Sequence, residues 1–447
     1  GGVAPLTILV PPPSSQTVVI VGAGLAGLAT AYQLRRQDYQ VTLLEYADWV
    51  DGFRTNAADP VGITLGCHRE TKRILQEIPQ SQDTDSDQTI PLEFRLPTGQ
   101  TVPYQSARLP GALQWMMSFF NFQGLSWQDR WRLFSHVEQI WEQAESLPSD
   151  LENRTADEWL RATGQSPEAR ERIWAPLAQW LTGNALVRLS AATFVHLLST
   201  VFLHDASDAR LTYHFGTIAQ RFLIPLKESL HRNHVRFIPL AQPPQIRFGQ
   251  AGIQDIRFPD GTPLQAGWYI SALSYQDLLR LLPERFLTRY AYFAHLTELQ
   301  SLGEIVVQLT IHTTSQPPRL LLFDGKPFHH LTRSPVGAQE VVVRLTGTEI
   351  SLMGLDEEQV INTAQVKTAT VLCDLSMSDI TSRQVFRDDH ATLLLAPGAA
   401  RLRPLQQSPV RNLLVAGAWT DTNWPPNVES ALVSARRCTE IITGRPS

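Results

Sequence analysis

The sequence predicts an α/β protein in which a discontinuous, Rossmann-like domain carries an inserted second domain. Three observations support this fold class. A strand, a glycine-rich turn and a helix follow one another at 17–34, a second strand with a glycine stop lies at 412–417, and strand-like and helix-like stretches lie between them. A parallel sheet with its first strand near one end of the chain and its last strand near the other must take further strands from the middle.

Length and composition exclude several classes of protein. The chain has 447 residues, of which 43% are hydrophobic and 18% charged, so it is neither disordered nor a small disulfide scaffold. The formal net charge of −5 and the lack of a Lys/Arg block argue against nucleic-acid binding. Cys67, Cys373 and Cys438 are widely separated, which favours a reducing compartment and predicts no metal site.

The beginning of the chain does not have the pattern of a secretory signal. Residues 1–16 include three consecutive prolines and no basic segment, and we interpret them as a flexible leader. The longest weakly polar run, 18–32, is too short to span a membrane and contains three glycines. We therefore expect a cytoplasmic location, with association at the inner face of the membrane left open.

The strongest local signal is a glycine motif between a strand and a helix. It consists of Gly22, Ala23, Gly24, Leu25, Ala26 and Gly27. Its first glycine permits a tight turn, the second lets the backbone approach a pyrophosphate, and the third lets the helix pack on the strand. The helix N-terminus adds N–H donors. A second strand ends in Glu45, near the spacing expected of a carboxylate that binds ribose hydroxyls, so the unit predicts a dinucleotide site.

The closing part of the chain predicts a second helix N-terminus directed at the same ligand. Residues 412–417 have the pattern of a buried strand that stops at a glycine. Small and apolar residues then alternate from Pro425 to Arg437. Proline in the first turn predicts a helix that begins near Pro426, with its N–H groups aimed back at the sheet.

These segments resemble FAD-dependent flavoproteins of the flavin amine oxidase and phytoene desaturase superfamily. The chain looks most like the squalene-associated desaturase branch, whose activity is hydroxysqualene dehydroxylation, and the similarity extends from residue 17 to 443. Besides the glycine motif and 416–435, it is carried by Leu65–Leu75, Thr155–Leu160, Arg172–Leu177, Tyr269–Leu273, His390–Thr392 and Arg403–Pro404.

The resemblance implies FAD as the cofactor and suggests which further residues bind it. Beyond the glycine motif and Glu45 these are Gly52, Arg54, Val235, Arg403, Gly417, Ala418, Pro425, Asn427, Val428 and Ala431. The chain also departs from the family pattern at the cofactor. Asp51 and Phe53 alter a Gly-Gly-Arg turn, the segment 55–64 is short, and Ala418 replaces an acidic residue. Ser430 and Ala435 replace helix glycines, where added side chains would crowd the flavin or the neighbouring strand.

The resemblance further implies a discontinuous Rossmann-like FAD-binding domain with an inserted substrate domain. The expected FAD-binding domain comprises 17–75, 217–283 and 385–445, and the expected substrate-binding domain comprises 76–216 and 284–384. Helical periodicity in 109–215 predicts a helical cap, and strand-like runs in 290–380 predict the antiparallel sheet of the family plan. An apolar isoprenoid substrate would be enclosed between cap and sheet.

The activity implied by the resemblance is reductive. Reduced flavin would deliver hydride to an allylic carbon of a C30 isoprenoid alcohol as water leaves, which gives squalene. A carotenoid or phytoene-type desaturase or an amine oxidase on the same fold remains an alternative, in which oxidised flavin accepts the hydride. The alternative from another functional class is a binding protein: a flavin-poor, non-catalytic relative on the same fold that binds an isoprenoid or a membrane.

An acid or hydrogen-bond donor near the hydroxyl of the isoprenoid alcohol would help this hydroxyl to leave as water. The catalytic candidates at family-like positions are His68, Arg69, Glu70, Tyr213 and His214. His329 and His330 lie on a predicted strand, where neighbouring side chains point to opposite faces, and they complete no metal pattern.

The segment Leu109–Trp127 is rich in aromatic residues, contains two methionines and has almost no charge. Two interpretations stay open. It forms either a core helix with a loop or a peripheral membrane contact at the mouth of a tunnel, through which a lipid-soluble substrate enters. The sequence does not indicate the oligomeric state.

Overall fold

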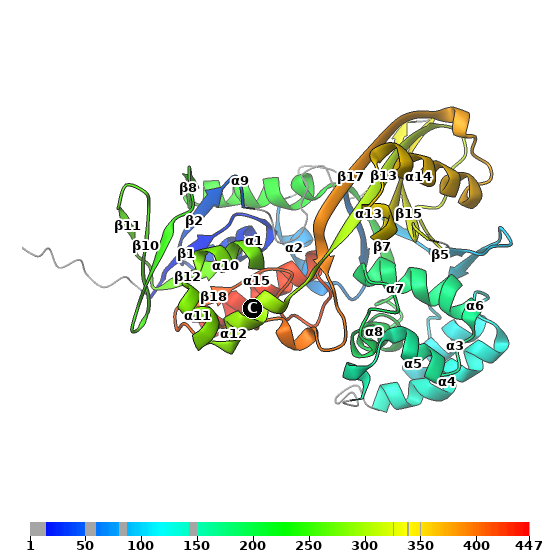
Figure 1. The fold of residues 1–447 in the computed structure, drawn as a ribbon, viewed down its shortest axis with the longest axis horizontal. Helices are drawn as coiled ribbons and strands as arrows, with labels where there is room; N and C mark the ends of the chain where they lie inside the picture. Colours follow the sequence, from blue (N-terminus) through cyan, green and yellow to red (C-terminus); the bar gives the residue numbers. More distant parts are fainter. Residues whose placement is uncertain are drawn as a thin grey trace, which may run out of the picture.

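The computed structural model describes residues 15–49, 60–79, 87–142, 150–324, 326–337, 339–348 and 350–446. Figure 1 shows two lobes, which we call the Rossmann lobe and the second lobe. The segments that build the Rossmann lobe come from both ends and the middle of the chain. This arrangement confirms the predicted discontinuous α/β fold.

The Rossmann lobe is built on a five-stranded parallel sheet in the order β18-β12-β1-β2-β8. Its strands are β1 (Thr17–Val21), β2 (Gln40–Tyr46), β8 (Arg236–Leu240), β12 (Trp268–Ser271) and β18 (Leu413–Val415). Residues 18–21 of the central strand are at most 3% exposed, as expected for a parallel strand covered on both faces. A small antiparallel sheet of β9 (Gln245–Gly249), β10 (Gly252–Arg257) and β11 (Pro263–Leu264) extends from one edge.

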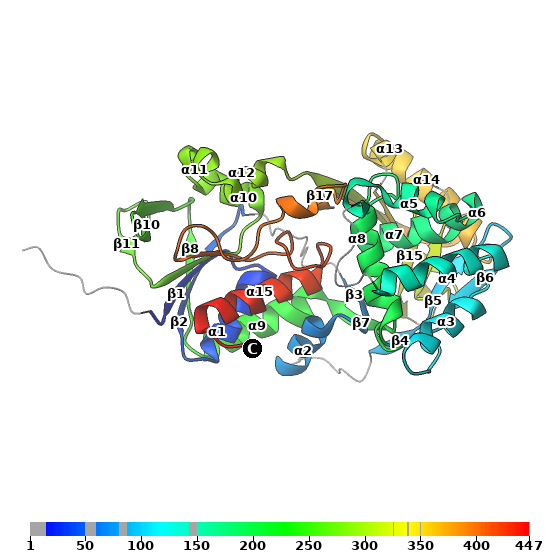
Figure 2. The same ribbon diagram turned by 90° about the horizontal axis from the view of Figure 1, so that it is seen from below.

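Helices α1 and α15 pack against each other in this lobe, and Figure 2 shows them side by side. The helices of the lobe are α1 (Leu25–Arg35), α2 (Arg69–Glu77), α9 (Ile224–Arg232), α10 (Tyr275–Leu281), α11 (Glu284–Arg289), α12 (Ala291–Ala294) and α15 (Val428–Thr443). Helix α15 begins two residues later than its sequence pattern predicts, because Asn427 is its N-cap.

The second lobe contains a seven-stranded sheet in the order β17-β13-β16-β15-β14-β5-β6. Its strands are β5 (Leu92–Arg95), β6 (Thr101–Tyr104), β13 (Ser301–His312), β14 (Leu320–Phe323), β15 (His330–Gly337), β16 (Glu340–Gly347) and β17 (Ile380–Leu393). All neighbouring pairs are antiparallel except β14 and β5. The β5–β6 hairpin comes from the segment before the cap and was not predicted, and β17 crosses the expected domain boundary at 385.

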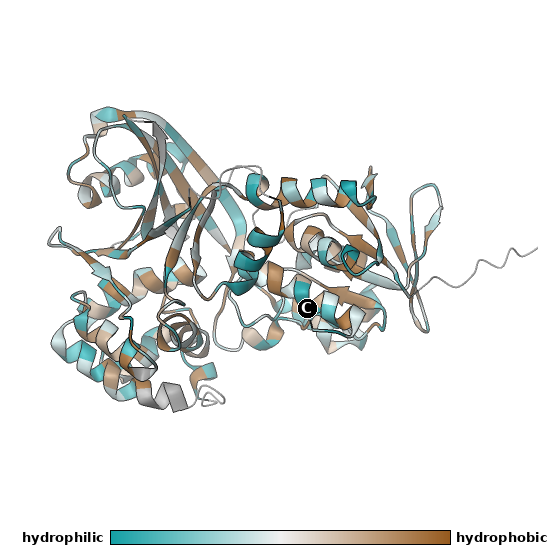
Figure 3. Ribbon diagram, turned by 180° about the vertical axis from the view of Figure 1, so that it is seen from behind, coloured by the Kyte–Doolittle hydropathy of each residue, from teal (hydrophilic) through white to brown (hydrophobic). Residues whose placement is uncertain are grey.

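The two faces of this sheet have different partners. Ile305, Val307 and Leu309 on β13 are fully buried and pack with Val360 and Ala364 of α14 (Glu357–Val371). Strand alternation turns the residues between them toward the opposite face. The mixed teal and brown colouring of these strands in Figure 3 reflects this alternation.

Helices beneath the sheet form the predicted cap, as Figure 1 shows. They are α3 (Ala112–Asn121), α4 (Trp127–Glu142), α5 (Ala156–Ala162), α6 (Pro167–Ala169), α7 (Ala175–Thr182) and α8 (Ala191–Leu198), while α13 (Ile350–Met353) lies with α14. Wide π-helical turns occupy Arg170–Trp174, Ser199–Leu203 and Ala219–Leu223.

A three-stranded sheet of β3 (Pro60–Leu65), β7 (Leu211–Thr217) and β4 (Gln88–Ile90) lies between the lobes. No helix in the described parts of the chain is long and apolar enough to cross a membrane.

The segment Leu109–Trp127 has both a buried and an exposed side. Trp115 and Phe122 are at most 6% exposed and join the core of the cap, whereas Leu113 and Trp127 are 54% and 62% exposed. The buried side agrees with the core interpretation, while the exposed side leaves the membrane contact as a prediction.

Gly27 allows α1 to approach the turn that precedes it. A Cβ atom on Gly27 would lie 2.1 Å from the backbone oxygen of Gly22, a distance that no relaxed structure tolerates. We therefore expect Gly27→Ala to lower the free energy of unfolding by about 1–3 kcal/mol. Urea denaturation of the apoprotein measures this change. The matched control is Gly354→Ala, because a Cβ there meets nothing within 4 Å. Equal stability of the two variants would contradict the assigned packing.

Candidate functional site

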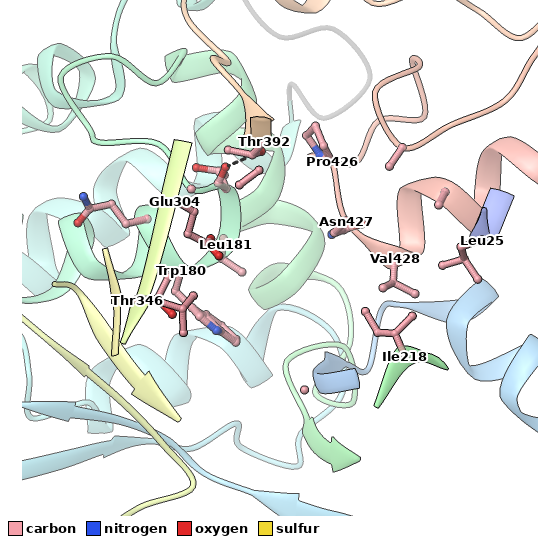
Figure 4. Close-up of a pocket in the computed structure, with 18 of the residues that line it drawn as sticks. Leu25, Trp180, Leu181, Ile218, Glu304, Thr346, Thr392, Pro426, Asn427 and Val428 are labelled. Carbon is pink, nitrogen blue, oxygen red and sulfur yellow. Dashed lines mark hydrogen bonds between the residues drawn. The ribbon is translucent and has the colours of Figure 1, made fainter. Parts of the chain in front are cut away.

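A cavity of about 390 Å³ lies between the two lobes. Figure 4 shows Leu25, Asn427 and Val428 on one side, facing Glu304 and Thr346 on the other. Eight of the residues expected to bind the cofactor line this cavity: Gly24, Leu25, Ala26, Gly417, Ala418, Asn427, Val428 and Ala431. Residues far apart in the sequence are thus brought together around one space.

The N-terminus of α1 is suited to bind an anion at the cavity wall. Gly24 is its N-cap, no side chain caps the helix, and its first turn has no acidic residue. Gly24, Leu25 and Ala26 line the cavity, so the N–H groups of the first turn and the positive end of the helix dipole lie there. Gly22 has a φ of +107°, and a Cβ there would lie 2.8 Å from the oxygen of Ala272. This glycine turn fits the pyrophosphate of FAD.

The N-terminus of α15 reaches the same cavity from the opposite end of the chain. Its N-cap, Asn427, accepts a hydrogen bond from the backbone N–H of Ser430 at 2.8 Å. Asn427, Val428 and Ala431 line the cavity. Two helix N-termini around one cavity fit a ligand that is long, anionic at one part and ring-shaped at another, as FAD is.

The departures from the family pattern in α15 do not project into the cavity. Ser430 is fully buried and donates from its hydroxyl to the backbone oxygen of Ala418 at 2.7 Å. Ser434 accepts from the N–H of Gly417 at 2.9 Å, and Ala435 packs in the core with α1. The expected crowding of the flavin is therefore absent at these positions, because Ser430 and Ala435 face the neighbouring strand and helix.

Arg403 holds the loop that follows β18. Its guanidinium donates to the backbone oxygens of Ala418, Trp419, Thr420 and Trp424, at distances between 2.6 and 3.1 Å. Burial lowers the pKa of Arg403 to about 10, so it stays charged at neutral pH. Arg403 does not line the cavity, and its geometry supports a role in positioning Ala418 in place of the expected direct flavin contact.

The remaining residues expected at the cofactor lie outside the cavity lining. Glu45 is the next-to-last residue of β2 and forms an ion pair with Lys227 at 2.8 Å, and Val235 is buried just before β8. Gly22 and Ala23 lie in the turn before α1, Gly27 lies in the first turn of α1, and Pro425 precedes the N-cap of α15. Gly52 and Arg54, together with Asp51 and Phe53, lie outside the described residues.

The first three catalytic candidates lie away from the cavity. His68 packs edge-on against Trp424 and accepts from the N–H of Leu65, and burial lowers the pKa of His68 to about 3. Glu70 forms ion pairs with Arg73 and Arg436. The side chain of Arg69 is 82% exposed, 3.9 Å from Asp208.

Tyr213 and His214 are also engaged elsewhere. The hydroxyl of Tyr213 lies 2.8 Å from Ser334 Oγ. His214 lies between Thr64 Oγ1 and Asp87 Oδ2, both at 2.8 Å, and Asp87 also pairs with Arg221. None of the five candidates lines the cavity, so the geometry supports no catalytic role for them.

The wall formed by the second lobe was missed by sequence reasoning. It consists of Gln179, Trp180, Leu181, Thr182 and Gly183 at the end of α7, and Glu304, Val306, His329, His330, Thr332, Arg344, Thr346, Ala391 and Thr392 of the sheet. The register pairs Val306 with Thr346 and His330 with Thr346, which sets their side chains on one face. The alternation of apolar residues at 304–311 indicated a strand with one buried face. It did not show which distant strands pair with this one, and that pairing decides which side chains share the cavity wall.

The prediction that His329 and His330 point to opposite faces was wrong. Both line the cavity, and their ring centroids are 4.7 Å apart. Strand β15 begins only at His330, so the alternation rule does not apply to the residue before it. In the part of the chain that the structure describes, no group of three His, Cys, Asp or Glu residues is placed to hold a metal ion.

Comparisons with known proteins agree with this geometry. The family described as "Flavin containing amine oxidoreductase" matches residues 25–443. The zeta-carotene desaturase of Zea mays is 21% identical over 96% of this chain and 83% of its own length. The 15-cis-phytoene desaturase of Narcissus pseudonarcissus is 22% identical over 96% of this chain and 80% of its own.

Solved structures show the same fold at lower identity. A putrescine oxidase bound to putrescine superposes with a TM-score of 0.68 and 14% identity, over 96% of this chain and 99% of that one. Cyclohexylamine oxidase from Brevibacterium oxydans gives a TM-score of 0.65 and 15% identity, over 96% and 98%.

Replacement of Arg403 tests its role in positioning the loop. We expect Arg403→Met to leave four backbone oxygens without their charged donor, which destabilises the loop by about 2–4 kcal/mol and lowers the amount of FAD retained. The ratio of flavin absorbance to protein after purification, together with the melting temperature, measures both effects. Arg401→Met removes an exposed arginine two residues away and serves as the control. Unchanged flavin content in Arg403→Met would contradict the positioning role.

Proposed function

The chain belongs to the family of flavin-containing amine oxidoreductases, and from this premise we propose that it transfers hydride between FAD and an isoprenoid. It is an FAD-dependent oxidoreductase on a Rossmann-like fold. The isoprenoid class and the direction of transfer are the proposed part, and reductive dehydroxylation of hydroxysqualene to squalene is the reaction that we favour.

Bound FAD supplies the hydride chemistry, and the residues of this chain supply position and a cavity shielded from water. The helix N-termini at Gly24 and Asn427 bind and orient the cofactor on one side. The end of α7 and the cavity face of the seven-stranded sheet enclose the substrate on the other. Trp180 and Leu181 contribute apolar surface, which suits an isoprenoid chain.

The observation that favours an oxygenated substrate is the polar character of the sheet wall. Glu304, Thr332, Arg344 and Thr346 line the cavity together with a histidine pair. A pure hydrocarbon offers no hydrogen-bond partner to such a wall, so burying these groups against it is unfavourable. An isoprenoid alcohol has the hydroxyl that this wall requires.

A carotene-type desaturase remains the second candidate. It is favoured by the curated relatives, whose names identify zeta-carotene and phytoene desaturases and whose lengths are largely covered. In that reaction the isoprenoid loses hydride to oxidised flavin. The two candidates therefore differ in the redox state in which the flavin meets the substrate.

Anaerobic reduction of the holoenzyme separates these candidates. We expect hydroxysqualene to reoxidise the reduced flavin and to yield squalene in stoichiometric amount, because the hydride moves from flavin to the allylic carbon. Flavin absorbance and analysis of extracted lipids follow the two products. Free reduced FAD with hydroxysqualene is the control. Bleaching of the oxidised enzyme by phytoene, zeta-carotene or an amine, without reoxidation by hydroxysqualene, would select the second candidate or an amine oxidase.

We also propose that the cap contacts a membrane surface peripherally. Leu109, Leu113, Met117, Trp127 and Trp131 are between 42% and 62% exposed, and we call them the α3–α4 patch. The exposed Arg108 and Arg132 stand beside these residues in the sequence. Tryptophan with flanking arginine is the composition of interfacial contacts, and the patch belongs to the same lobe as the substrate wall. A cytoplasmic protein that acts at the inner membrane face remains the expectation for its location.

Co-sedimentation with vesicles tests the α3–α4 patch. We expect the double variant Trp127→Ser and Trp131→Ser to reduce binding to vesicles that contain anionic lipid by about tenfold or more, since two large apolar side chains lose their burial. The matched control is Val366→Ser, which removes an apolar side chain that is 68% exposed on α14. Equal binding of both variants would show that the patch does not contact lipid.

A further inference from the structure

His329 and His330 form an unusual pair at the cavity wall. Their rings lie 4.7 Å apart, with an angle of 50° between the ring planes. The residues are 3% and 9% exposed, and both line the cavity. Two imidazoles thus share one buried position next to the space where substrate is proposed to bind.

The backbone fixes this pair firmly in the sheet. The N–H of His329 donates to the oxygen of Thr346 at 3.1 Å, and the N–H of Phe323 donates to the oxygen of His329 at 3.1 Å. His330 is paired with Thr346 in the register of β15 and β16. Figure 4 shows Thr346, the register partner of His330, on the wall across from Asn427 and Val428.

The imidazoles have hydrogen-bonding capacity that the protein does not use. The Nδ1 atoms of His329 and His330 are buried, and neither has a hydrogen-bond partner among the described residues. Buried polar atoms without a partner are rare in native proteins because they give up water without compensation. Since both Nδ1 atoms are buried out of reach of the cavity, a ligand there can bond only to the other ring nitrogen, Nε2, of each histidine.

Both imidazoles are neutral at physiological pH. Burial lowers the pKa of His330 to about 3, and burial together with His330 lowers the pKa of His329 well below its usual value. A neutral imidazole has one donor and one acceptor nitrogen. The pair therefore matches a group that both donates and accepts, and it lacks the positive charge that an anion requires.

The charged residues of the same wall are already engaged. Arg344 donates from Nε to Gln308 Oε1 at 2.8 Å, and Glu304 also interacts within the protein. The pair is also not part of a three-residue metal-ligand group among the described residues. Both charged side chains of this wall thus take part in interactions within the protein.

We propose that His329 and His330 bind the hydroxyl group of an isoprenoid alcohol, one ring accepting its O–H and the other donating N–H to its oxygen. This assignment rests on the proposed function and adds the residues that determine its selectivity. The pair is a positioning site: it holds the carbon–oxygen bond at the wall opposite the two helix N-termini.

Ligand titration of the oxidised holoenzyme tests the assignment without turnover, because oxidised flavin has no hydride to give. The probes are hydroxysqualene and squalene in detergent micelles, and perturbation of the flavin spectrum reports binding. We expect the wild-type protein to bind the alcohol about tenfold or more tightly than the hydrocarbon. Equal affinity for the two ligands would overturn the proposal.

Variants of the pair locate the selectivity. His329→Leu and His330→Leu are each expected to bring the alcohol-to-hydrocarbon ratio close to one, whereas His330→Asn, which keeps a donor and an acceptor, restores part of it. His312→Leu makes the same change at an exposed end of the same sheet and should leave the ratio unchanged. Leucine variants that retain flavin and the wild-type ratio would overturn the assignment.

The methyl ether of hydroxysqualene provides a test that needs no variant. It accepts a hydrogen bond but cannot donate one, so we expect it to bind the wild-type protein more weakly than the alcohol and more tightly than squalene. Equal binding of ether and alcohol would overturn the two-histidine arrangement. Selective binding of the alcohol without reoxidation of reduced flavin would refute the proposed reaction and leave this site standing.

Discussion

The contact between Gly27 and the backbone oxygen of Gly22 is the constraint on which the rest of the structure depends. With no side chain at Gly27, α1 lies close against the turn and the end of β1, and its N-terminus opens into the cavity. The carboxyl edge of a parallel sheet is where such a helix end and a ligand meet. A side chain at this point would displace the helix and with it the donors intended for the cofactor.

A second, long-range interaction places the other helix at the same edge. Glu429 in the first turn of α15 is 3% exposed, and its carboxylate accepts from the N–H groups of Glu70 and Thr71 and from the Thr71 hydroxyl, at 2.7 to 3.1 Å. Burial raises the pKa of Glu429, while the bonds from Thr71 and Glu70 lower it. One carboxylate thus stabilises the N-termini of α2 and α15 together. It joins segments more than 350 positions apart.

The sequence was sufficient for one half of the candidate site and not for the other. Gly24 and Asn427 were predicted because each belongs to a local pattern in which turn, cap and helix follow directly along the chain. His330 and Arg344 were not, because their common face is set by the pairing of β15 with β16 and of β16 with β13. His68 and Glu70 lie within the family-like segment Leu65–Leu75, yet ion pairs and packing hold them outside the cavity. Proximity in the chain is a poor guide to a cavity formed by two lobes.

Under the proposed function, the polar wall would let a cavity lined partly by apolar residues distinguish an isoprenoid alcohol from its parent hydrocarbon. Hydrophobic contact with Trp180 and Leu181 scales with the buried area and differs little between an alcohol and its parent hydrocarbon. A ring nitrogen at the cavity surface loses its hydrogen bond to water when a hydrocarbon covers it, which costs about 1–3 kcal/mol, and a hydroxyl avoids this cost by providing the partner. Discrimination of this kind acts mainly by rejection of the wrong ligand. The proposed selectivity therefore belongs to the second lobe, while the Rossmann lobe can bind the same cofactor for any direction of hydride transfer.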